Sequence, residues 1–171
     1  MIRVLDRHDA ARFQRLRLEA LHESPTAFAS SYDQESDTPL AEIALRLKPD
    51  RDWSWVLGAF IESEELVGMV GFRREHGPKH AHKAMLWGMF VKPDHRGCGI
   101  GRTLIQEVLA RARAIDGLEQ IKLTVNPIQE AAVHLYSSLG FRKFGREQRA
   151  LKIGDRYFDE DHLVLRLHDD G

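Results

Sequence analysis

Residues 91–102 read Val91-Lys92-Pro93-Asp94-His95-Arg96-Gly97-Cys98-Gly99-Ile100-Gly101-Arg102: the end of a predicted strand, a glycine-rich turn and the start of a predicted helix. The first turn of a helix has backbone N–H groups without helical partners, which together with the helix dipole favour a bound anion. The glycines let a phosphate approach the backbone, and Arg96 and Arg102 add cationic donors at the rim. The stretch predicts a phosphate-binding turn, although the glycines alone would also fit a plain tight turn.

Two familiar phosphate-binding motifs do not fit this turn. The loop of nucleotide triphosphatases needs Gly-Lys followed by Ser or Thr, which occurs nowhere in the chain. The dinucleotide motif G-x-G-x-x-G would need glycine at position 102 or 104, where the chain has Arg102 and Leu104. The pattern that does fit is R-x-x-G-x-G, formed by Arg96, Gly99 and Gly101.

The chain before this turn predicts a strand, two helices and three further strands. A strand at 2–5 leads into a helix capped by Asp6 or Asp9, with an apolar face of Phe13, Leu16, Ala20 and Leu21. The segment 24–39 reads as irregular, and a second helix at 40–47 ends before Pro49. Residues 53–62 and 66–74 predict a β-hairpin, and 84–91 a strand in which Gly88 marks a bulge.

The chain after the turn alternates helices and strands. Apolar residues at helical spacing predict a helix over 100–115 that Gly117 closes, followed by a strand at 121–125. A helix from about Pro127 to Leu139 and strands at 141–148 and 157–167 complete the chain. The order is β-α-α-β-β-β-α-β-α-β-β. Strands 84–91 and 121–125 are expected to be parallel neighbours joined by a right-handed crossover, within a mixed sheet.

The composition argues against several classes of protein. A length of 171 residues fits one domain spanning 1–171, and a net charge of −1 predicts no general attraction to nucleic acid or to an anionic membrane. The single cysteine, Cys98, excludes an internal disulfide. No stretch reaches the roughly 20 apolar residues of a membrane span, and the N-terminus lacks an apolar signal core. We therefore expect a cytoplasmic protein.

A second motif lies downstream of the glycine-rich turn. Residues 123–141 read Leu123-Thr124-Val125-Asn126-Pro127-Ile128-Gln129-Glu130-Ala131-Ala132-Val133-His134-Leu135-Tyr136-Ser137-Ser138-Leu139-Gly140-Phe141. Together with R-x-x-G-x-G and the preceding Met89-Phe90-Val91-x-Pro93, this segment resembles the GCN5-related N-acetyltransferase (GNAT) superfamily, in which a helix bearing A-x-x-L-Y ends in Gly-Phe. The resemblance implies an α/β (α+β) fold. Its central sheet has about seven mostly antiparallel strands, helices on both faces and a splayed parallel strand pair.

The resemblance also implies a binding mode for acetyl-CoA. The pantetheine arm would enter the splay and bond to the backbone of the first strand, and the turn would hold the pyrophosphate. The expected cofactor-binding residues are Phe90, Val91, Arg96, Gly97, Cys98, Gly99, Ile100, Gly101, Arg102, Asn126, Gln129 and Ala132. Asn126-Pro127-x-Gln129 also fits an N-cap, a first-turn proline and a capping-box glutamine, so both readings stay open for Asn126 and Gln129.

The catalytic residues follow from the same resemblance. Tyr136 matches the family's tyrosine general acid, and the competing reading is a core tyrosine on the buried face of its helix. The backbone N–H of Met89 would stabilise the oxyanion of a tetrahedral intermediate. Some relatives carry a glutamate on the splayed strand, whereas strand 85–91 has no carboxylate. Glu35 is the candidate base or acceptor contact, and a solvated loop carboxylate is the alternative.

Two other sets of reactive side chains give weaker indications of function. Cys98 lies in the phosphate turn, a pantetheine length from the thioester, so a covalent acyl-cysteine is not expected. His76, His80 and His82 match no zinc spacing and are read as solvated loop residues, so no metal is predicted.

The resemblance implies an N-acyltransferase that moves an acetyl group from acetyl-CoA to an amine by direct attack. A non-catalytic CoA-binding module of the same fold is the main alternative, and a nucleotide-binding domain is a weaker one. Small amines and protein or peptide amines remain open as acceptors, with the expected acceptor loops at 23–40, 75–83 and 150–158. The analogy also leaves room for a homodimer through the C-terminal strands.

Overall fold

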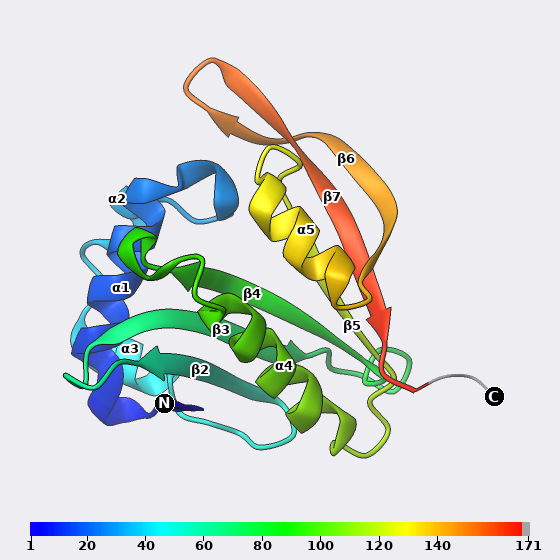
Figure 1. Ribbon diagram of the computed structural model, residues 1–171, viewed down its shortest axis with the longest axis horizontal. Helices are drawn as coiled ribbons and strands as arrows, with labels where there is room; N and C mark the ends of the chain where they lie inside the picture. The colour runs from blue at the N-terminus through cyan, green and yellow to red at the C-terminus, as the bar shows by residue number, and fades with distance from the viewer. Residues whose placement is uncertain (169–171) are drawn as a thin grey trace.

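In the computed structural model, which describes residues 1–168, one seven-stranded sheet organises the chain (Figure 1). The strand order is β1-β2-β3-β4-β5-β7-β6, and every neighbouring pair is antiparallel except the parallel pair β4–β5. The strands are β1 (Ile2–Val4), β2 (Ser54–Phe60), β3 (Leu66–Arg74), β4 (Lys83–Val91), β5 (Gln120–Val125), β6 (Arg142–Ile153) and β7 (Arg156–Arg166). The predicted mixed, mostly antiparallel sheet is confirmed.

Helices cover both faces of the sheet, because strand side chains alternate between two apolar cores. On β2, Trp55 and Leu57 face the core beneath α4 (Ile100–Arg113) and α5 (Glu130–Ser138), whereas Val56 faces the core beneath α1 (Ala10–Glu23) and α3 (Leu40–Arg46). A short helix, α2 (Tyr32–Glu35), and three 3-10 turns, η1 (Arg7–Asp9), η2 (Pro25–Ala27) and η3 (Pro93–His95), complete the elements.

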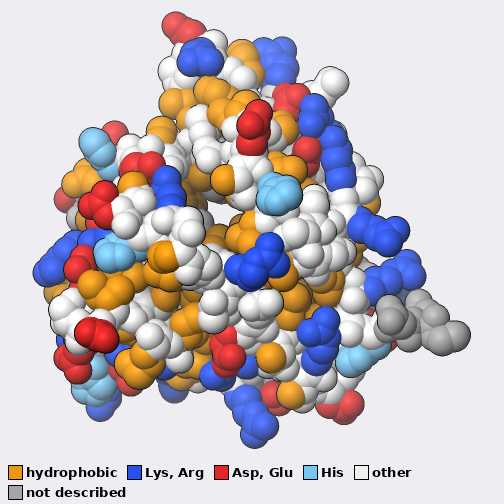
Figure 2. Space-filling view, viewed as in Figure 1, with side chains coloured by type: hydrophobic (Ala, Val, Ile, Leu, Met, Phe, Trp, Pro, Cys, Tyr) orange, Lys and Arg blue, Asp and Glu red, His pale blue; other side chains and the backbone are white. Residues whose placement is uncertain are grey.

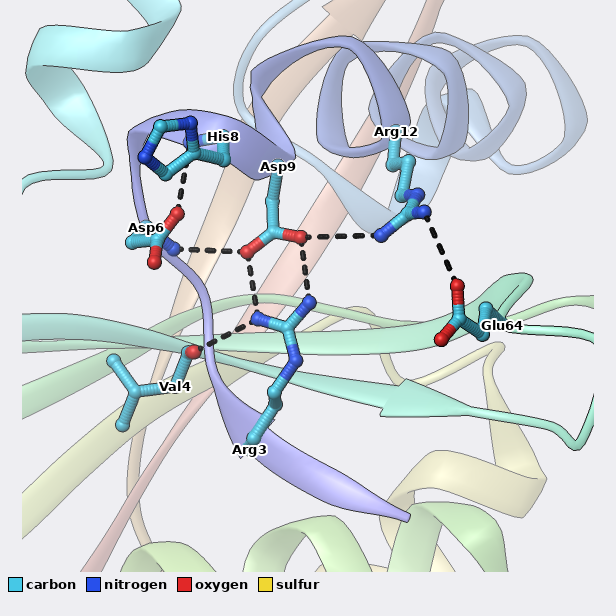
Figure 3. A network of polar contacts seen from close by, with 7 residues as sticks. All are labelled: Arg3, Val4, Asp6, His8, Asp9, Arg12 and Glu64. Atoms are coloured by element: carbon cyan, nitrogen blue, oxygen red, sulfur yellow. Dashed lines mark hydrogen bonds and ion pairs between the residues drawn. The ribbon is translucent and has the colours of Figure 1, made fainter.

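A polar network fixes the entry into α1 (Figure 3). Arg3 on β1 donates two hydrogen bonds of 2.7 Å to the buried carboxylate of Asp9, which also accepts the backbone N–H of Asp6. Arg12 lies 3.6 Å from the same carboxylate and 3.8 Å from Glu64, on the connection between β2 and β3. The hydrogen bonds from Arg3 hold the pKa of Asp9 below its usual value. The network therefore ties α1 to the edge of the sheet.

The parallel pair β4–β5 diverges along its length. The two strands pair only over Lys83–Met85 and Gln120–Lys122, at the start of each strand. Further along β4, Gly88 has φ +63°, and the register against β3 shifts between Met69 and Gly71. The bulge predicted at Gly88 is therefore confirmed, and it turns the second half of β4 away from β5.

Several element boundaries differ from the sequence-based expectations. Helix α4 ends at Arg113, ahead of Gly117, which lies in the turn that follows it. The expected loop at 150–158 is the end of the β6–β7 hairpin, because β6 and β7 pair as far as Ile153 and Arg156. The segment 24–39 contains η2 and α2 rather than being wholly irregular. Among the helices of residues 1–168, none has the length and apolar character needed to span a bilayer.

Candidate functional site

A cavity of about 670 Å³ opens where β4 and β5 diverge, and Figure 2 shows this face of the molecule hollowed there. That volume falls in the range of small-molecule sites, roughly 300–1,000 Å³. The cavity collects most of the predicted site residues: Met89, Phe90, Val91, Arg96, Gly97, Gly99, Ile100, Gly101, Arg102, Asn126, Gln129, Ala132 and Tyr136. Two predicted residues, Glu35 and Cys98, are not part of its lining.

The glycine-rich turn forms an open cradle at one end of the cavity. Gly97 and Gly99 have φ +78° and +87°, a backbone conformation that favours glycine. A Cβ at either position would meet no other atom within 4 Å, so the space in front of the turn is empty of protein. Gly99 is also the N-cap residue of α4, so the cradle faces the positive end of that helix.

Backbone donors converge on this cradle. Thr103 is the first residue whose N–H finds a backbone acceptor at the start of α4, bonding to the Gly99 carbonyl at 3.0 Å. Within residues 1–168, no protein acceptor pairs with the six preceding N–H groups, at positions 97–102. Unpaired N–H groups at a helix N-terminus bind phosphate, and the open cradle leaves room for one. The residues present therefore fit a diphosphate.

The two arginines of the turn have partners within the protein. Arg96 donates from Nε to the Val91 carbonyl at 2.8 Å, and its guanidinium lies 3.1 Å from the carboxylate of Glu23 on α1. Hydrogen bonding to Arg96 lowers the pKa of Glu23. Arg102 donates to the hydroxyl of Ser138 on α5 at 2.7 Å. Sequence reasoning missed Glu23, because nothing in the local pattern links α1 to a loop some 70 residues later.

The third glycine of the motif has a packing role. A Cβ on Gly101 would lie 3.2 Å from Cε of Met89 and 3.4 Å from Cδ2 of Leu135. The start of α4 therefore sits close to both the bulged strand and α5. Cys98 points away from the cavity: it is exposed, and its thiol donates to the His95 carbonyl at 2.8 Å.

Tyr136 lines the cavity from α5 with its ring buried. The side chain is 6% exposed and packs edge-on against Phe141. Within residues 1–168, no protein group hydrogen-bonds to the phenol. Burial raises the pKa of Tyr136, so the phenol keeps its proton throughout the neutral and mildly alkaline range. Tyr136 is thus a largely buried residue that forms part of the cavity wall, and its role as general acid stays a prediction.

The segment before α5 corrects the predicted capping motif. The helix begins at Glu130, and its N-cap residue is Gln129, which makes no side-chain cap hydrogen bond. Asn126 instead accepts the N–H of Ile128 at 3.1 Å, which closes a turn ahead of the helix. Gln129 donates to the hydroxyl of Thr26 in η2 at 3.3 Å. Both amides line the cavity, where a cofactor contact remains a prediction.

The opposite end of the cavity is largely apolar. Its wall includes Ala27 at the end of η2, Phe28 directly after it, and Trp87 next to the bulge. Glu35 lies behind this wall, with both carboxylate oxygens hydrogen-bonded to Arg17 at 3.1 Å. A role for Glu35 as base or acceptor contact stays a prediction. In this structure its side chain lies one layer behind the residues that line the cavity.

The loop histidines lie away from this cavity. His76 stacks on Trp53 with ring centroids 4.7 Å apart, and His80 lies 3.6 Å from Glu75. Across residues 1–168, no three His, Cys, Asp or Glu side chains are grouped so as to hold a metal ion.

Residues 17–141 match the Acetyltransferase (GNAT) family, a span that includes the glycine-rich turn, the bulged strand and Tyr136. The chain belongs to this family. Its fold agrees: a GNAT acetyltransferase from Streptococcus pneumoniae superposes with a TM-score of 0.85 at 22% identity, covering 97% of this chain and 98% of that one. The Salmonella typhimurium protein yncA, solved with acetyl-CoA, superposes with a TM-score of 0.79 at 21% identity, covering 100% of this chain and 95% of that one.

Curated relatives of the family match over shorter spans. Human N-acetyltransferase 8 is 40% identical over 87 residues, which cover 50% of this chain and 38% of that protein. The Escherichia coli peptidyl-lysine N-acetyltransferase YjaB is 37% identical over 94 residues, covering 55% and 52%. The Vibrio cholerae spermidine N(1)-acetyltransferase is 29% identical over 106 residues, covering 62% and 61%. The matched spans thus reach from about two fifths to three fifths of the relatives' own lengths.

Proposed function

We propose that this chain is an N-acetyltransferase that takes the acetyl group of acetyl-CoA and passes it to an amine by direct attack. The observation that carries the proposal is the set of six unpaired backbone N–H groups at 97–102, facing an open cradle beside the splayed strands. The phosphate groups of CoA need such donors, and its extended pantetheine arm needs the gap between β4 and β5. The Salmonella relative solved with acetyl-CoA supports the choice of cosubstrate.

Tyr136 is the residue we assign to protonate the departing thiolate. Its phenol borders the cavity and is free of protein hydrogen bonds within residues 1–168. The raised pKa keeps it a proton donor throughout the neutral and mildly alkaline range. The backbone N–H of Met89, beside the bulge, is assigned to the developing oxyanion.

The acceptor is an amine that enters from the apolar end of the cavity. Relatives named for peptidyl-lysine and for spermidine acetylation support an amine of this general kind. No carboxylate on β4 lines the cavity, so the acceptor loses its proton to water or to a group outside that strand. Activity is therefore expected to rise with pH as the fraction of neutral amine rises.

Thiol release from acetyl-CoA, measured with a panel of amines, tests the proposal. Tyr136→Phe is expected to lower kcat by about 10²–10⁴-fold, because it removes a general acid, while CoA binding stays within a few-fold of wild type. Phe144→Leu, an exposed aromatic position on β6 outside the cavity lining and the expected acceptor loops, is the control and is expected to keep full activity. CoA binding without turnover of any amine would favour a non-catalytic CoA-binding module, and full activity of Tyr136→Phe at every pH would refute the acid role.

A further inference from the structure

A buried ion pair lies directly behind the apolar end of the cavity. Arg17 on α1 donates from Nε and Nη2 to the two carboxylate oxygens of Glu35 on α2, each at 3.1 Å. The two side chains are only 8% and 15% exposed. Gln14, one turn earlier on α1, donates to the backbone carbonyl of Glu35 at 2.8 Å and so holds the backbone at Glu35 against α1. The orientation of the Arg17 guanidinium is therefore set by Glu35, whose backbone Gln14 holds in turn.

The third nitrogen of this guanidinium has no partner. Nη1 of Arg17 is buried and makes no hydrogen bond within residues 1–168. Buried donors in folded proteins are almost always paired, and leaving a charged one unpaired is destabilising. Glu35 uses only the Nε and Nη2 side of the fork, so the two N–H bonds of Nη1 are unused. Nη1 therefore needs a hydrogen-bond acceptor, and residues 1–168 do not supply one.

The unpaired nitrogen points at the cavity wall. A Cβ built on Gly88 would lie 3.4 Å from Nη1, and no other atom would lie within 4 Å of it. The guanidinium carbon also lies 4.9 Å from the ring of Phe28 and 6.0 Å from that of Trp87. These three neighbours all line the cavity. Nη1 is thus separated from the acceptor end by one layer of lining residues at the bulge.

The geometry points to Arg17 Nη1 as the donor that binds a carboxylate oxygen on the acceptor, which makes the acceptor class an amine that also carries a carboxylate. This inference rests on the proposed acetyltransferase function and names the substrate of that same cavity. A guanidinium nitrogen can only donate hydrogen bonds, so it binds an acceptor oxygen but not a second ammonium such as that of a polyamine. A carboxylate gives the stronger, charge-assisted bond.

Access to Nη1 follows from the same contacts. The nitrogen is closed to water in this structure, with Phe28 and Trp87 beside it. A carboxylate reaches it once one of these rings turns aside, and Gly88 presents no side chain in the way. The amine of the same molecule then lies on the bulge side of the cavity, toward Met89 and the reacting carbon. Glu35 acts as the positioning residue that holds Arg17.

The test compares matched acceptors that differ only in the carboxylate: leucine against 3-methylbutylamine, and phenylalanine against phenethylamine. We measure kcat/KM by thiol release for wild type and Arg17→Gln. In wild type the carboxylate-bearing member is expected to gain roughly 10- to 100-fold from the bond to Nη1, an advantage that Arg17→Gln abolishes. Dividing the wild-type ratio by the variant ratio cancels the different basicities of the two amines.

A binding measurement provides a readout independent of turnover. Calorimetry on the CoA-saturated protein compares N-acetylleucine with N-(3-methylbutyl)acetamide, and wild type is expected to bind the former more tightly by a similar factor. Arg15→Gln, on the exposed side of α1, is the matched control and is expected to behave as wild type. Arg17→Lys, which keeps the charge but lacks Nη1, serves if Arg17→Gln fails to fold, and is expected to lose the preference too.

The outcomes separate this inference from the function on which it rests. Turnover of both amines in each pair, with a preference that the Arg17 variants leave unchanged, would overturn the carboxylate subsite and leave the acetyltransferase in place. Nη1 would then be a structural donor that holds a bound water. Failure of every amine to turn over would overturn the proposed function, and the acceptor assignment with it.

Discussion

Gly99→Ala separates the binding role of the glycine-rich turn from its role in folding. Gly99 has φ +87°, and a Cβ there would point into empty space within the cradle. A non-glycine residue in that conformation costs about 1–2 kcal/mol of stability, partly offset by the lower entropy of the unfolded chain. Gly154, in the β6–β7 turn, has φ +60° and equally open surroundings, so Gly154→Ala carries a similar backbone cost far from the cavity.

The two variants are expected to differ in CoA affinity. A Cβ at position 99 holds a phosphate away from the neighbouring N–H groups, and losing one hydrogen bond to a charged group weakens binding by roughly 10- to 100-fold. Urea unfolding measures stability and isothermal titration calorimetry measures the Kd for CoA. Both variants are expected to lose about 1 kcal/mol of stability, and only Gly99→Ala to lose affinity. A Gly99→Ala protein that binds CoA within two-fold of wild type would refute the reasoning.

Two further predictions concern stability. Arg146 holds the pKa of Asp161 at about 2, against about 3.9 unfolded, so Asp161 stabilises the fold above about pH 4 and that stability is lost as the pH falls toward about 2. Because Arg146 is 40% exposed, Asp161→Asn is expected to lower the free energy of unfolding by only about 1–2 kcal/mol at pH 7, and by almost nothing near pH 2. Urea unfolding at the two pH values measures this difference, and an equal cost at both would contradict the stabilising role of the Arg146–Asp161 ion pair. Gly71→Ala would place a Cβ 2.0 Å from the Trp87 ring, so it is expected to destabilise the protein by about 1–3 kcal/mol or more in thermal unfolding, and an unchanged Tm would contradict the packing.

The sheet and the phosphate turn were predictable because their signals are local. Glycines at fixed spacing before an amphipathic helix define an N-terminal cradle, and Gly88 within an apolar strand marks the bulge. The predicted helix boundaries were less accurate where a side chain bonds to backbone N–H groups near the helix start. Asn126 bonds to the N–H of Ile128 and closes a turn, which delays the start of α5 to Glu130.

The contacts behind the cavity could not be read from the sequence. Arg17 and Glu35 lie 18 residues apart and meet only because α1 and α2 pack side by side over the bulge. Glu23 pairs with Arg96 across 73 residues, a distance over which local patterns carry no information. Such pairs depend on the tertiary arrangement, and here they border both ends of the candidate site.

The central claim is that the backbone N–H groups at 97–102 hold the diphosphate of CoA. Amide nitrogen–proton correlation spectra of the labelled protein, recorded during titration with CoA, test it at the atoms concerned. We predict that the largest downfield proton shifts fall on Gly97 to Arg102, and that amides of the β6–β7 turn stay in place. Saturable CoA binding that leaves the amides of 97–102 unshifted would contradict the claim.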